Sequence, residues 1–510
     1  MPLLSFRTAD VWQAWETHQR WKVEVDWDGD GSFDNAYTDL NAYVVGPVQC
    51  VRGRDYASQL TGRAVAGKLQ ATLRNNTGLF SSFNASSALY GSVRPGLKVR
   101  AWALTPYTEV LWTGKLDSIQ PKAAGGGAGE PSAVLIASGI FKGLGDQANL
   151  VSPEAMPSAT ADEVIDAVLD AAGHPTADRD LELGVVPIAN WFAEEKVALL
   201  ALQEMEEAEI GFVYEGLDWD VVFENRYHRM LESAAVQLTV SDDPASSYPY
   251  MRLEQADAVR DIYNKLTCEV ANYSAAALAV LWTLSEGTVY LAPGASITRK
   301  ATYTAGYVYP WTTPAAGTDV VSTGGTIAIS GVVKSGQTMT FTITNSHATE
   351  GSLITLIQAR GVAYTAGQPF QVESEDSTSQ SKYGQRTYPL PSPYYSNAAF
   401  AEAADQYFVS RQKDPHPVLT LTLPSSSSAA LALQAGSRRI SDRINVEATK
   451  LLTKLGLDQD FFIESIAHVF GAGVPWETTF LLSPADVVVN YWILGDATYG
   501  VLGSTTKGAY

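Results

Sequence analysis

Cysteine, histidine and long apolar runs are all scarce in this sequence. Its two cysteines, Cys50 and Cys268, lie far apart in a chain of 510 residues. We therefore expect two buried thiols rather than a disulfide, in a protein made in a reducing cytoplasm. No apolar run reaches the ~18 residues that a membrane-spanning helix needs. The first residues lack a basic start followed by an apolar stretch, so we do not expect a secretion signal.

Basic residues are scarce as well. Lys and Arg total 35 against 55 Asp and Glu, which gives a net charge of -20. Such an acidic surface repels phosphate backbones, so the composition argues against a protein that reads nucleic-acid sequence. Charged residues make up only 18%, whereas Gly, Pro, Tyr and Trp are plentiful. This composition excludes wholesale disorder and coiled coil, and the length suggests roughly three or four globular domains.

The motifs of common enzyme classes are missing. None of the six histidines lies at metal-binding spacing from another, and there is no GxSxG, HExxH or P-loop lysine. The GGGAG run at 125–129 lacks the Lys-Ser/Thr of a phosphate cradle, so we interpret it as a hairpin tip or loop. Ser379 and Lys382 match the SxxK of serine acyl-enzymes, but SDN and KTG are absent, which favours a polar loop. Glu206 and Glu207 fit a solvated helix face better than an acid–base pair, so we expect no enzyme.

The hydrophobic pattern changes along the chain. Polar and apolar residues alternate at 66–75, as in a half-buried strand. Within 150–245 the pattern becomes helical, because Thr160 and Glu163 form a capping box in front of apolar residues at helical spacing. A hairpin pattern follows near 210–226. These changes predict an α+β domain after a β domain.

Residues 271–370 stand apart by composition, with few charged residues and much Thr, Ser, Gly and Ala. Alternating stretches separated by turns every ~8–12 residues indicate a β-sandwich. The sequence therefore predicts a mainly β fold with an α+β domain, two small β-barrels and an inserted β-sandwich. The expected parts are a lead-in (1–20), the first barrel (21–149), the α+β domain (150–245), the second barrel (246–270 and 371–495), the sandwich (271–370) and a C-terminal tail (496–510).

One pattern resembles a metal site. Asp26, Asp28, Asp30 and Asp34 alternate along a turn that contains glycine, and the Ser32 carbonyl supplies a further oxygen. Oxygen ligands at this spacing suit Ca²⁺, and carboxylates clustered without a cation repel one another. The twelfth position lacks the usual bidentate Glu. A hairpin turn held by Asx hydrogen bonds therefore stays open as the alternative.

Several segments occur in a recognisable order. Residues 67–75 read G-x-L-x-x-T-L-x-N, and a glycine turn and the RPG turn at 94–96 follow. In this combination the chain resembles the tail-hub proteins of tailed bacteriophages, whose first β-barrel contains the same strand and turns. The likeness covers most of the chain apart from roughly 1–20 and 271–372. Its segments are 52–103, 189–229, 381–423 and 491–510.

The resemblance implies a structural virion protein, the hub of the distal tail tip or baseplate. Such hubs usually form a homotrimeric ring whose two barrels per chain adapt a sixfold tail tube to threefold symmetry. The implied partners are the tail tube or a distal tail protein, the tape-measure protein and a central spike or fibre, with DNA passing through without sequence recognition. Assembly is then expected in the cytoplasm of the host bacterium. For a loop near the interface we single out Tyr383, Gly384, Arg386 and Tyr388, with a local turn held by tyrosine packing as the alternative.

A second function class rests on the low-charge segment. Tyr303, Tyr307, Tyr309 and Trp311 are aromatic residues that would stack on sugars if they were exposed. In that reading, the 271–370 module recognises a glycan on the host surface and the rest of the chain is its scaffold. The alternative is that these aromatic side chains fill the core of the sandwich or pack on a neighbour.

Overall fold

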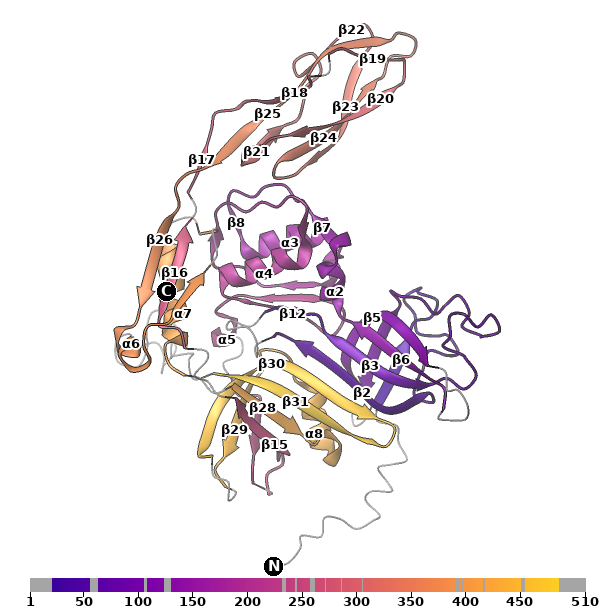
Figure 1. The fold of residues 1–510 in the computed structure, drawn as a ribbon, viewed down its shortest axis with the longest axis vertical. Helices are drawn as coiled ribbons and strands as arrows, with labels where there is room; N and C mark the ends of the chain where they lie inside the picture. Colours follow the sequence, from indigo (N-terminus) through magenta and orange to yellow (C-terminus); the bar gives the residue numbers. More distant parts are fainter. Residues whose placement is uncertain are drawn as a thin grey trace, which may run out of the picture.

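The computed structural model describes residues 21–485 apart from short stretches, and its elements form a body and an arm (Figure 1). We call residues 271–370 the arm and the other described residues the body. Strands predominate in both, so the expected mainly β fold is confirmed. The predicted lead-in, the C-terminal tail and the GGGAG run lie outside the described residues. The undescribed stretches within 21–485 are 56–62, 105–107, 123–129, 232–234, 244, 257–261, 271, 286, 305, 391–393, 396–397, 416–417 and 451–454.

A twelve-stranded sheet forms most of the body, and its first half has the order β1-β4-β5-β6-β3-β2. The alternation predicted for 66–75 is present in β3, where Leu69, Ala71 and Leu73 are buried while Lys68 and Arg74 are exposed. The buried side chains join one apolar core on that face of the sheet. The bounds are β1 (Trp21–Val25), β2 (Val44–Gly53), β3 (Lys68–Arg74), β4 (Lys98–Ala103), β5 (Glu109–Lys122) and β6 (Ser132–Ser138).

The second half of the sheet is built around the long strand β30. Along one edge, β30 pairs first with β29 and then with β2, and along the other edge it pairs with β31. From β31 the sheet continues through β28 to β15, and β14 lies parallel to β29. The bounds are β14 (Leu238–Ser241), β15 (Arg252–Ala256), β28 (Val418–Leu423), η4 (Ser425–Ser427), α8 (Ala429–Ser437), β29 (Arg443–Ala448), β30 (Leu457–Gly471) and β31 (Val474–Pro484).

The pairing of β2 with β30 makes the two halves one sheet, with Gly53 opposite Ser465. Gly53 has φ +121°, and a Cβ there would lie 2.4 Å from the Glu464 carbonyl oxygen, so only glycine fits this crossing. Among the strands that the structure describes, β1 and β15 are the ends of the main path. The strand pairing therefore does not show that either half closes into a barrel, and the two barrels stay a prediction.

The α+β part packs between the sheet and the arm (Figure 1). The predicted capping box is present at the start of α3, where Thr160 and Glu163 satisfy each other's backbone amides. The elements of the α+β part are α2 (Ile140–Gly145), η1 (Gln147–Asn149), β7 (Leu150–Val151), β8 (Ala159–Thr160), α3 (Ala161–Ala171), η2 (Thr176–Asp178), β9 (Arg179–Leu181), β10 (Pro187–Ile188), β11 (Lys196–Val197), α4 (Ala198–Glu209), β12 (Phe212–Glu215), β13 (Val221–Glu224) and α5 (His228–Leu231).

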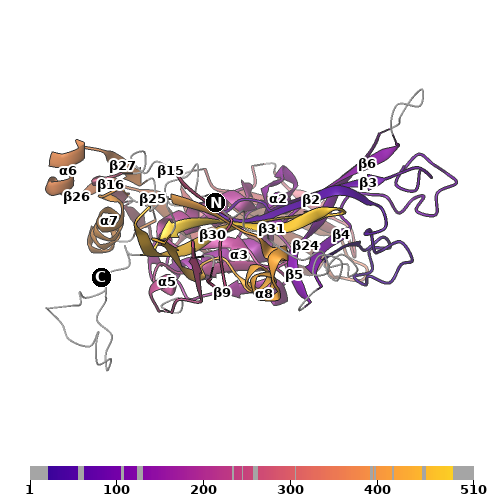
Figure 2. The ribbon, with the colours of Figure 1, turned by 90° about the horizontal axis from the view of Figure 1, so that it is seen from below.

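A separate three-stranded sheet, β26-β16-β27, lies within the range expected for the second barrel. The sequence assigns 246–270 and 371–495 to that barrel, and among the strands described in this range β15 and β28 to β31 join the large sheet, whereas β16, β26 and β27 do not. Leu266, Cys268 and Phe408 instead bury their side chains in the core of the α+β part. We call this sheet and its helices the root, and Figure 2 shows it at the opposite end of the body from β3 and β6. The root contains β16 (Lys265–Val270), β26 (Phe370–Glu375), α6 (Ser377–Tyr383), β27 (Thr387–Leu390) and α7 (Ala398–Gln412).

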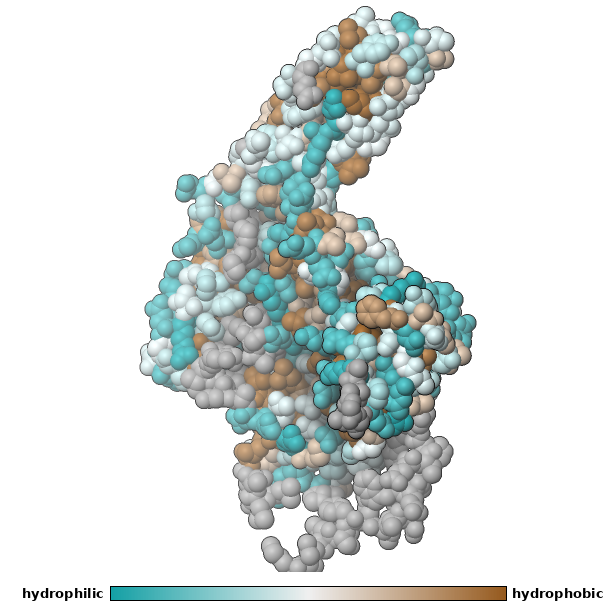
Figure 3. All heavy atoms as spheres, turned by 45° about the vertical axis from the view of Figure 1, so that its right-hand side comes forward, coloured by the Kyte–Doolittle hydropathy of each residue, from teal (hydrophilic) through white to brown (hydrophobic). Residues whose placement is uncertain are grey.

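Two sheets that share one apolar core form the arm, as expected of a sandwich. In one sheet β25 pairs with five other strands, and the second has the order β20-β24-β23. Much of the arm surface in Figure 3 is white or brown, which agrees with its low charge. The bounds are β17 (Tyr273–Ala275), β18 (Ala279–Thr283), β19 (Val289–Leu291), β20 (Ser296–Thr302), β21 (Tyr307–Thr312), β22 (Val320–Thr323), β23 (Ile327–Lys334), β24 (Thr338–Asn345) and β25 (Ser352–Ala366).

Candidate functional site

A buried ion network lies where the two halves of the sheet meet α4, and we call this place the junction. Arg54, directly after β2, is 2% exposed. Its Nε donates to Glu206 Oε1 at 2.9 Å, and its Nη1 donates to Glu464 Oε2 at 3.1 Å. Glu206 also accepts the backbone amides of Ala64 and Val213. A single arginine thus connects β2, α4 and β30.

Glu464 of β30 lies at the centre of the network. Arg229 donates to it through Nη1 at 2.5 Å and Nη2 at 3.0 Å, and Ser483 donates its hydroxyl at 2.6 Å. Burial alone would raise the pKa of Glu464, but Arg229 and Arg54 outweigh burial and lower this pKa to about 2. The carboxylate is therefore ionised at neutral pH, and it is the shared counter-ion of two buried guanidinium groups.

The network continues into the β12–β13 hairpin through Glu224. Arg229 Nε donates to the Ser441 hydroxyl at 3.1 Å, and that hydroxyl donates to Glu224. Tyr214 donates its hydroxyl to Glu224 at 2.6 Å, and His228 Nε2 lies 3.2 Å from the same carboxylate. Ser441 has φ +68°, a backbone conformation that non-glycine residues adopt only where the surroundings hold it. The contacts of Ser441 with Arg229 and Glu224 are such surroundings.

The acidic face of α4 is not solvated, so that sequence prediction was wrong. Glu206 is 4% exposed and Glu209 is fully buried. Glu209 lies 3.4 Å from Arg226, so both buried acids have an arginine partner. Glu207 is half-buried and accepts a hydrogen bond from Tyr388. Sequence spacing gives no sign of this arrangement, because the arginine and tyrosine partners come from other elements.

Glu215, at the end of β12, is a buried carboxylate of a different kind. It accepts the amide of Gly67 at 2.8 Å and that of Phe141 at 2.7 Å. Phe141 lies in the first turn of α2, so Glu215 caps this helix from a distant part of the chain. Burial raises the pKa of Glu215 to about 7, although the two amides and Arg52 act to lower it. This side chain ties the first half of the sheet to the α+β part.

A cavity of about 370 Å³ opens at the junction, between β4, β5 and the β12–β13 hairpin. Arg52 is 5% exposed there, and its Nη2 donates to the Arg438 carbonyl at 3.2 Å. Burial, together with the nearby Arg439, lowers the pKa of Arg52 to about 10. Charges of both signs meet in the cavity, because its lining also includes Glu109, Asp180, Asp218 and Asp220.

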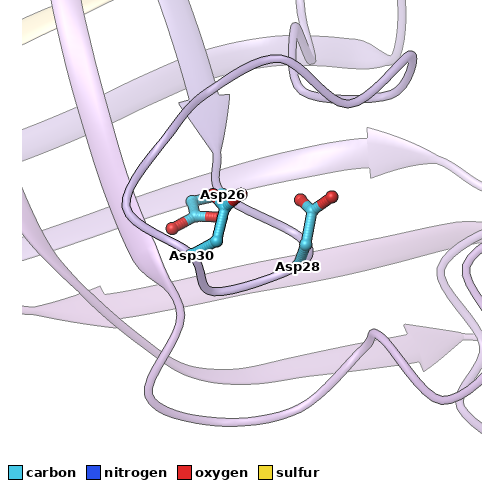
Figure 4. Close-up of side chains that lie close together, drawn as sticks. All are labelled: Asp26, Asp28 and Asp30. Atoms are coloured by element: carbon cyan, nitrogen blue, oxygen red, sulfur yellow. The ribbon is translucent and has the colours of Figure 1, made fainter.

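The acidic loop after β1 brings three of the five candidate Ca²⁺ ligands together. Asp26, Asp28 and Asp30 each place a carboxylate oxygen within 4.8 Å of the others (Figure 4). Asp34 is not part of this group, and Ser32 donates its amide and hydroxyl to Asp30. Asp26 also holds the turn, because it accepts the amides of Gly29 and Gly31. The loop therefore has the Asx hydrogen bonds of the alternative reading, and Ca²⁺ binding stays a prediction.

The candidate interface loop is fixed from within the chain. Asn264 is fully buried, donates through Nδ2 to the Gly384 carbonyl at 2.8 Å, and accepts the Arg386 amide at 2.8 Å. Tyr388 stacks on Phe408 with ring centroids 5.1 Å apart. These contacts match the local turn held by tyrosine packing, while a role of Tyr383, Gly384, Arg386 and Tyr388 at an interface stays a prediction.

The SxxK pair has no acyl-enzyme geometry. Ser379 is 2% exposed, and its hydroxyl donates to the Lys413 carbonyl and accepts from Asn264. Ser379 also donates its amide to Asp376, which caps the short helix α6. Lys382 lies in the last turn of α6. Ser379 is therefore a structural residue of the root, and its hydroxyl is already hydrogen-bonded.

Two of the four aromatic residues that would stack on sugars are enclosed, as in the alternative that the sequence left open, and a glycan role of the arm stays a prediction. Tyr307 is fully buried and Trp311 is 2% exposed, while Tyr303 and Tyr309 are half-buried. Trp311 lies in the apolar core of the arm and donates its Nε1 to the Ser335 carbonyl at 3.3 Å. Tyr307 is held against the body, as described below. A ring that is packed on both faces offers no surface to a sugar.

Both cysteines are buried thiols and neither forms a disulfide, as the sequence predicts. Burial raises the pKa of Cys50 and that of Cys268 to about 12. His468 is 2% exposed, and burial, reinforced by Arg52, lowers its pKa to about 3. Each of these groups is therefore neutral at pH 7 and belongs to the packed interior.

Comparisons with known proteins show which solved structures have a similar fold. No family model matches the sequence, and no curated protein matches it. The tail protein from Neisseria meningitidis MC58 is similar in structure, with a TM-score of 0.51 and 10% identity over 92% of this chain and 98% of that one. The 43 kDa tail protein of prophage MuSo2 from Shewanella oneidensis gives a TM-score of 0.46 and 11% identity over 92% and 99% of the two chains.

The likeness to the Neisseria protein shows that this chain has the fold of a tail protein, as the sequence resemblance implied. At 10% identity the likeness establishes the fold alone. Among the described residues, no helix is long and apolar enough to cross a membrane.

Proposed function

We propose that the chain is a structural component of a phage-type virion tail, the hub of its distal tip or baseplate. The single observation that carries this proposal is the shared fold with a tail protein over nearly the full length of both chains. The resemblance noted in the sequence points the same way. The arrangement of the junction fits such a role, because buried ion pairs hold three parts of the chain in one orientation.

The proposed assembly is a homotrimer. The sheet has two halves of similar size in each chain, joined by β2 and β30. Three chains then present six such halves, which match a sixfold tube above while keeping threefold symmetry for a central spike or fibre below. In this account the tail tube or distal tail protein and the tape-measure protein are further neighbours. The work is done by interfaces and no catalytic residue is required.

Charge supports a passive DNA channel. With a net charge of -20 per chain, the assembled ring repels phosphate and lets DNA move past without sequence recognition. The proposed location is the virion tail, after assembly in the cytoplasm of the bacterial host.

Electron cryomicroscopy of purified tails that carry the chain tests this proposal. We expect a threefold ring of the chain directly below the sixfold tube. Quantitative mass spectrometry of the same tails should give three copies of the chain per tail, compared with six subunits in each ring of the tube. Absence of the chain from the tail tip, or six copies per tail, would contradict the hub.

A further inference from the structure

The arm is joined to the root by a ribbon of two strands, which we call the stem. Val270 pairs with Phe370 at its lower end, and Tyr273 pairs with Ala366 at its upper end. Residues 367–369, between β25 and β26, belong to neither strand, so the ribbon is interrupted there. The Gly367 amide donates to the Asn272 carbonyl at 2.6 Å beside this interruption. A two-stranded ribbon is marginally stable by itself, so the interrupted stem alone does not fix the direction of the arm.

Contacts with one loop of the body, residues 190–194, fix that direction, and we call them the latch. Phe192 stacks on Tyr307 of β21 with ring centroids 4.8 Å apart, and Tyr307 stacks on Tyr364 of β25 at 4.6 Å. The Tyr307 hydroxyl donates to Asn190 Oδ1 at 2.6 Å. The aromatic column thus crosses from the arm to the body, with Tyr307 enclosed between its neighbours.

Glu194 supplies the polar side of the latch. It accepts the Ser335 hydroxyl at 2.9 Å, in the turn between β23 and β24, and the Thr338 hydroxyl at 3.2 Å, at the start of β24. Gly336 in the same turn touches Phe192, since a Cβ on Gly336 would lie 3.1 Å from Phe192 Cβ. The residue after Glu194 is Glu195, whose φ is +50° and whose amide donates to the Ser152 hydroxyl at 2.7 Å. The loop is therefore held in an unusual backbone conformation at the point where it meets the arm.

We propose that the arm is a lever, held against the body by the latch and able to pivot on the stem when the latch opens. The latch consists of one ring stack and a few hydrogen bonds from a single loop, in contrast to the buried network of the junction. Two ion pairs also join the arm to the body, one within the latch (Lys300 to Glu194) and one beside it (Lys334 to Glu154), and both are long at 3.9 Å. Small interfaces of this kind ordinarily permit domain motion, and the interrupted stem is the element that absorbs it.

Distance measurements on the full chain test the lever. Spin labels on Ser330→Cys in the arm and Thr176→Cys in the body report its direction, because both native positions are exposed and the two native cysteines are buried. We expect one narrow distance distribution with the latch intact and, in Phe192→Ala with Glu194→Ala, a distribution roughly twice as wide. Glu350→Ala, at a side chain that is 59% exposed on the arm, is the matched control and should leave the distribution narrow. An unchanged distribution in the latch variant would overturn the proposal.

A second experiment works even if the double alanine variant folds poorly. Phe192→Cys with Gly336→Cys places two thiols where the Cβ atoms are close enough for a disulfide after a small adjustment. The oxidised protein is then latched and the reduced form of the same protein is not. Hydrogen exchange of β17 in the stem should be at least about tenfold slower after oxidation. Equal exchange in the two forms would contradict a latch. Both experiments use the isolated chain, so they remain valid if the hub proposal fails.

Discussion

The junction and the latch hold parts of the same chain together by opposite means. At the junction, Arg54 and Arg229 share the fully enclosed carboxylate of Glu464. At the latch, Glu194 is 26% exposed and the main apolar contact is the stack of Phe192 on Tyr307. Breaking a buried charge pair is far more costly than losing a partly solvated contact. The comparison therefore indicates a body that stays rigid and an arm whose attachment to the body opens more readily than the junction does.

The largest expected effect comes from Glu464→Ala, which breaks the junction. It leaves Arg54 and Arg229 buried without their shared counter-ion, so we expect the free energy of unfolding to fall by about 3–5 kcal/mol. Denaturant unfolding of the full chain measures this. The control is Glu130→Ala, whose partner Arg74 is 51% exposed and where ~0–1 kcal/mol is expected. Equal losses in the two variants would remove the contrast between buried and exposed pairs.

The pH dependence of stability should have opposite signs for a buried acid of the root and for one of the junction. Asp405 of α7 is fully buried, neither of its carboxylate oxygens has a hydrogen-bond partner, and burial, with a further contribution from Glu402, raises its pKa to about 7. Between its ordinary pKa of 3.8 and about 7, the folded state binds a proton that the unfolded state releases. Stability from this group is therefore lost as pH rises through that window. Glu464, with its pKa lowered to about 2, loses its contribution in the opposite direction, as pH falls.

Asp405→Asn should remove the loss of stability that Asp405 causes as pH rises. The free energy of unfolding of the variant, measured relative to the wild type, should therefore increase by about 2–4 kcal/mol from pH 4 to pH 8. Urea unfolding at several pH values measures the change. Glu215, whose pKa is also raised to about 7, should keep a residual slope of the same sign in the variant. A variant whose stability follows the wild type at every pH would contradict the assignment to Asp405.

The acidic loop after β1 gives a further comparison, because its carboxylates gather close to one another rather than around an arginine. We propose that Asp26, Asp28 and Asp30 bind Ca²⁺, and a cation at 100 times its Kd would stabilise the fold by about 2.7 kcal/mol. Thermal unfolding with and without CaCl₂ measures this, with MgCl₂ as the ionic control. Asp28→Asn should abolish the shift, and it is preferable to a change at Asp26, which holds the turn itself. No shift in the wild type at millimolar Ca²⁺ would leave the turn a purely hydrogen-bonded one.

The smallest expected effect on stability is that of Tyr307→Phe. The variant keeps the ring stack and loses the hydrogen bond to Asn190, so we expect a loss of about 1 kcal/mol. Hydrogen exchange in the arm should rise while that of the junction stays constant. Tyr290→Phe, at a ring that is 66% exposed on the same arm, is the matched control and should change neither. A parallel change at the junction would show that the two regions are coupled.

The sequence predicts what depends on neighbouring residues. The strand alternation around Leu69, the capping box of Thr160 and the low-charge composition of 271–370 each appear in the structure as a strand, a helix start and a two-sheet arm. In each case the signal lies within a few residues of the element that it specifies. The mainly β fold follows from the sum of such local signals.

The site could not be predicted in the same way, because its partners are distant in sequence. Glu206 pairs with Arg54 across 152 residues, and Arg54 reaches Glu464 across 410. Read alone, the acidic run on α4 is typical of a solvated face, and only the fold supplies the arginine that makes its burial tolerable. The separate sheet of the root could not be predicted for the same reason, since β16 alternates like any strand and its partner sheet depends on packing.

Hydrogen exchange followed by mass spectrometry on the unmodified full chain tests the contrast most directly. Peptides covering β2 and β30 should exchange only through global unfolding. Peptides covering β17 and the loop at 190–194 should exchange at least about tenfold faster, through an opening that leaves the junction closed. Equal protection in the two regions would contradict an arm that pivots on a rigid body.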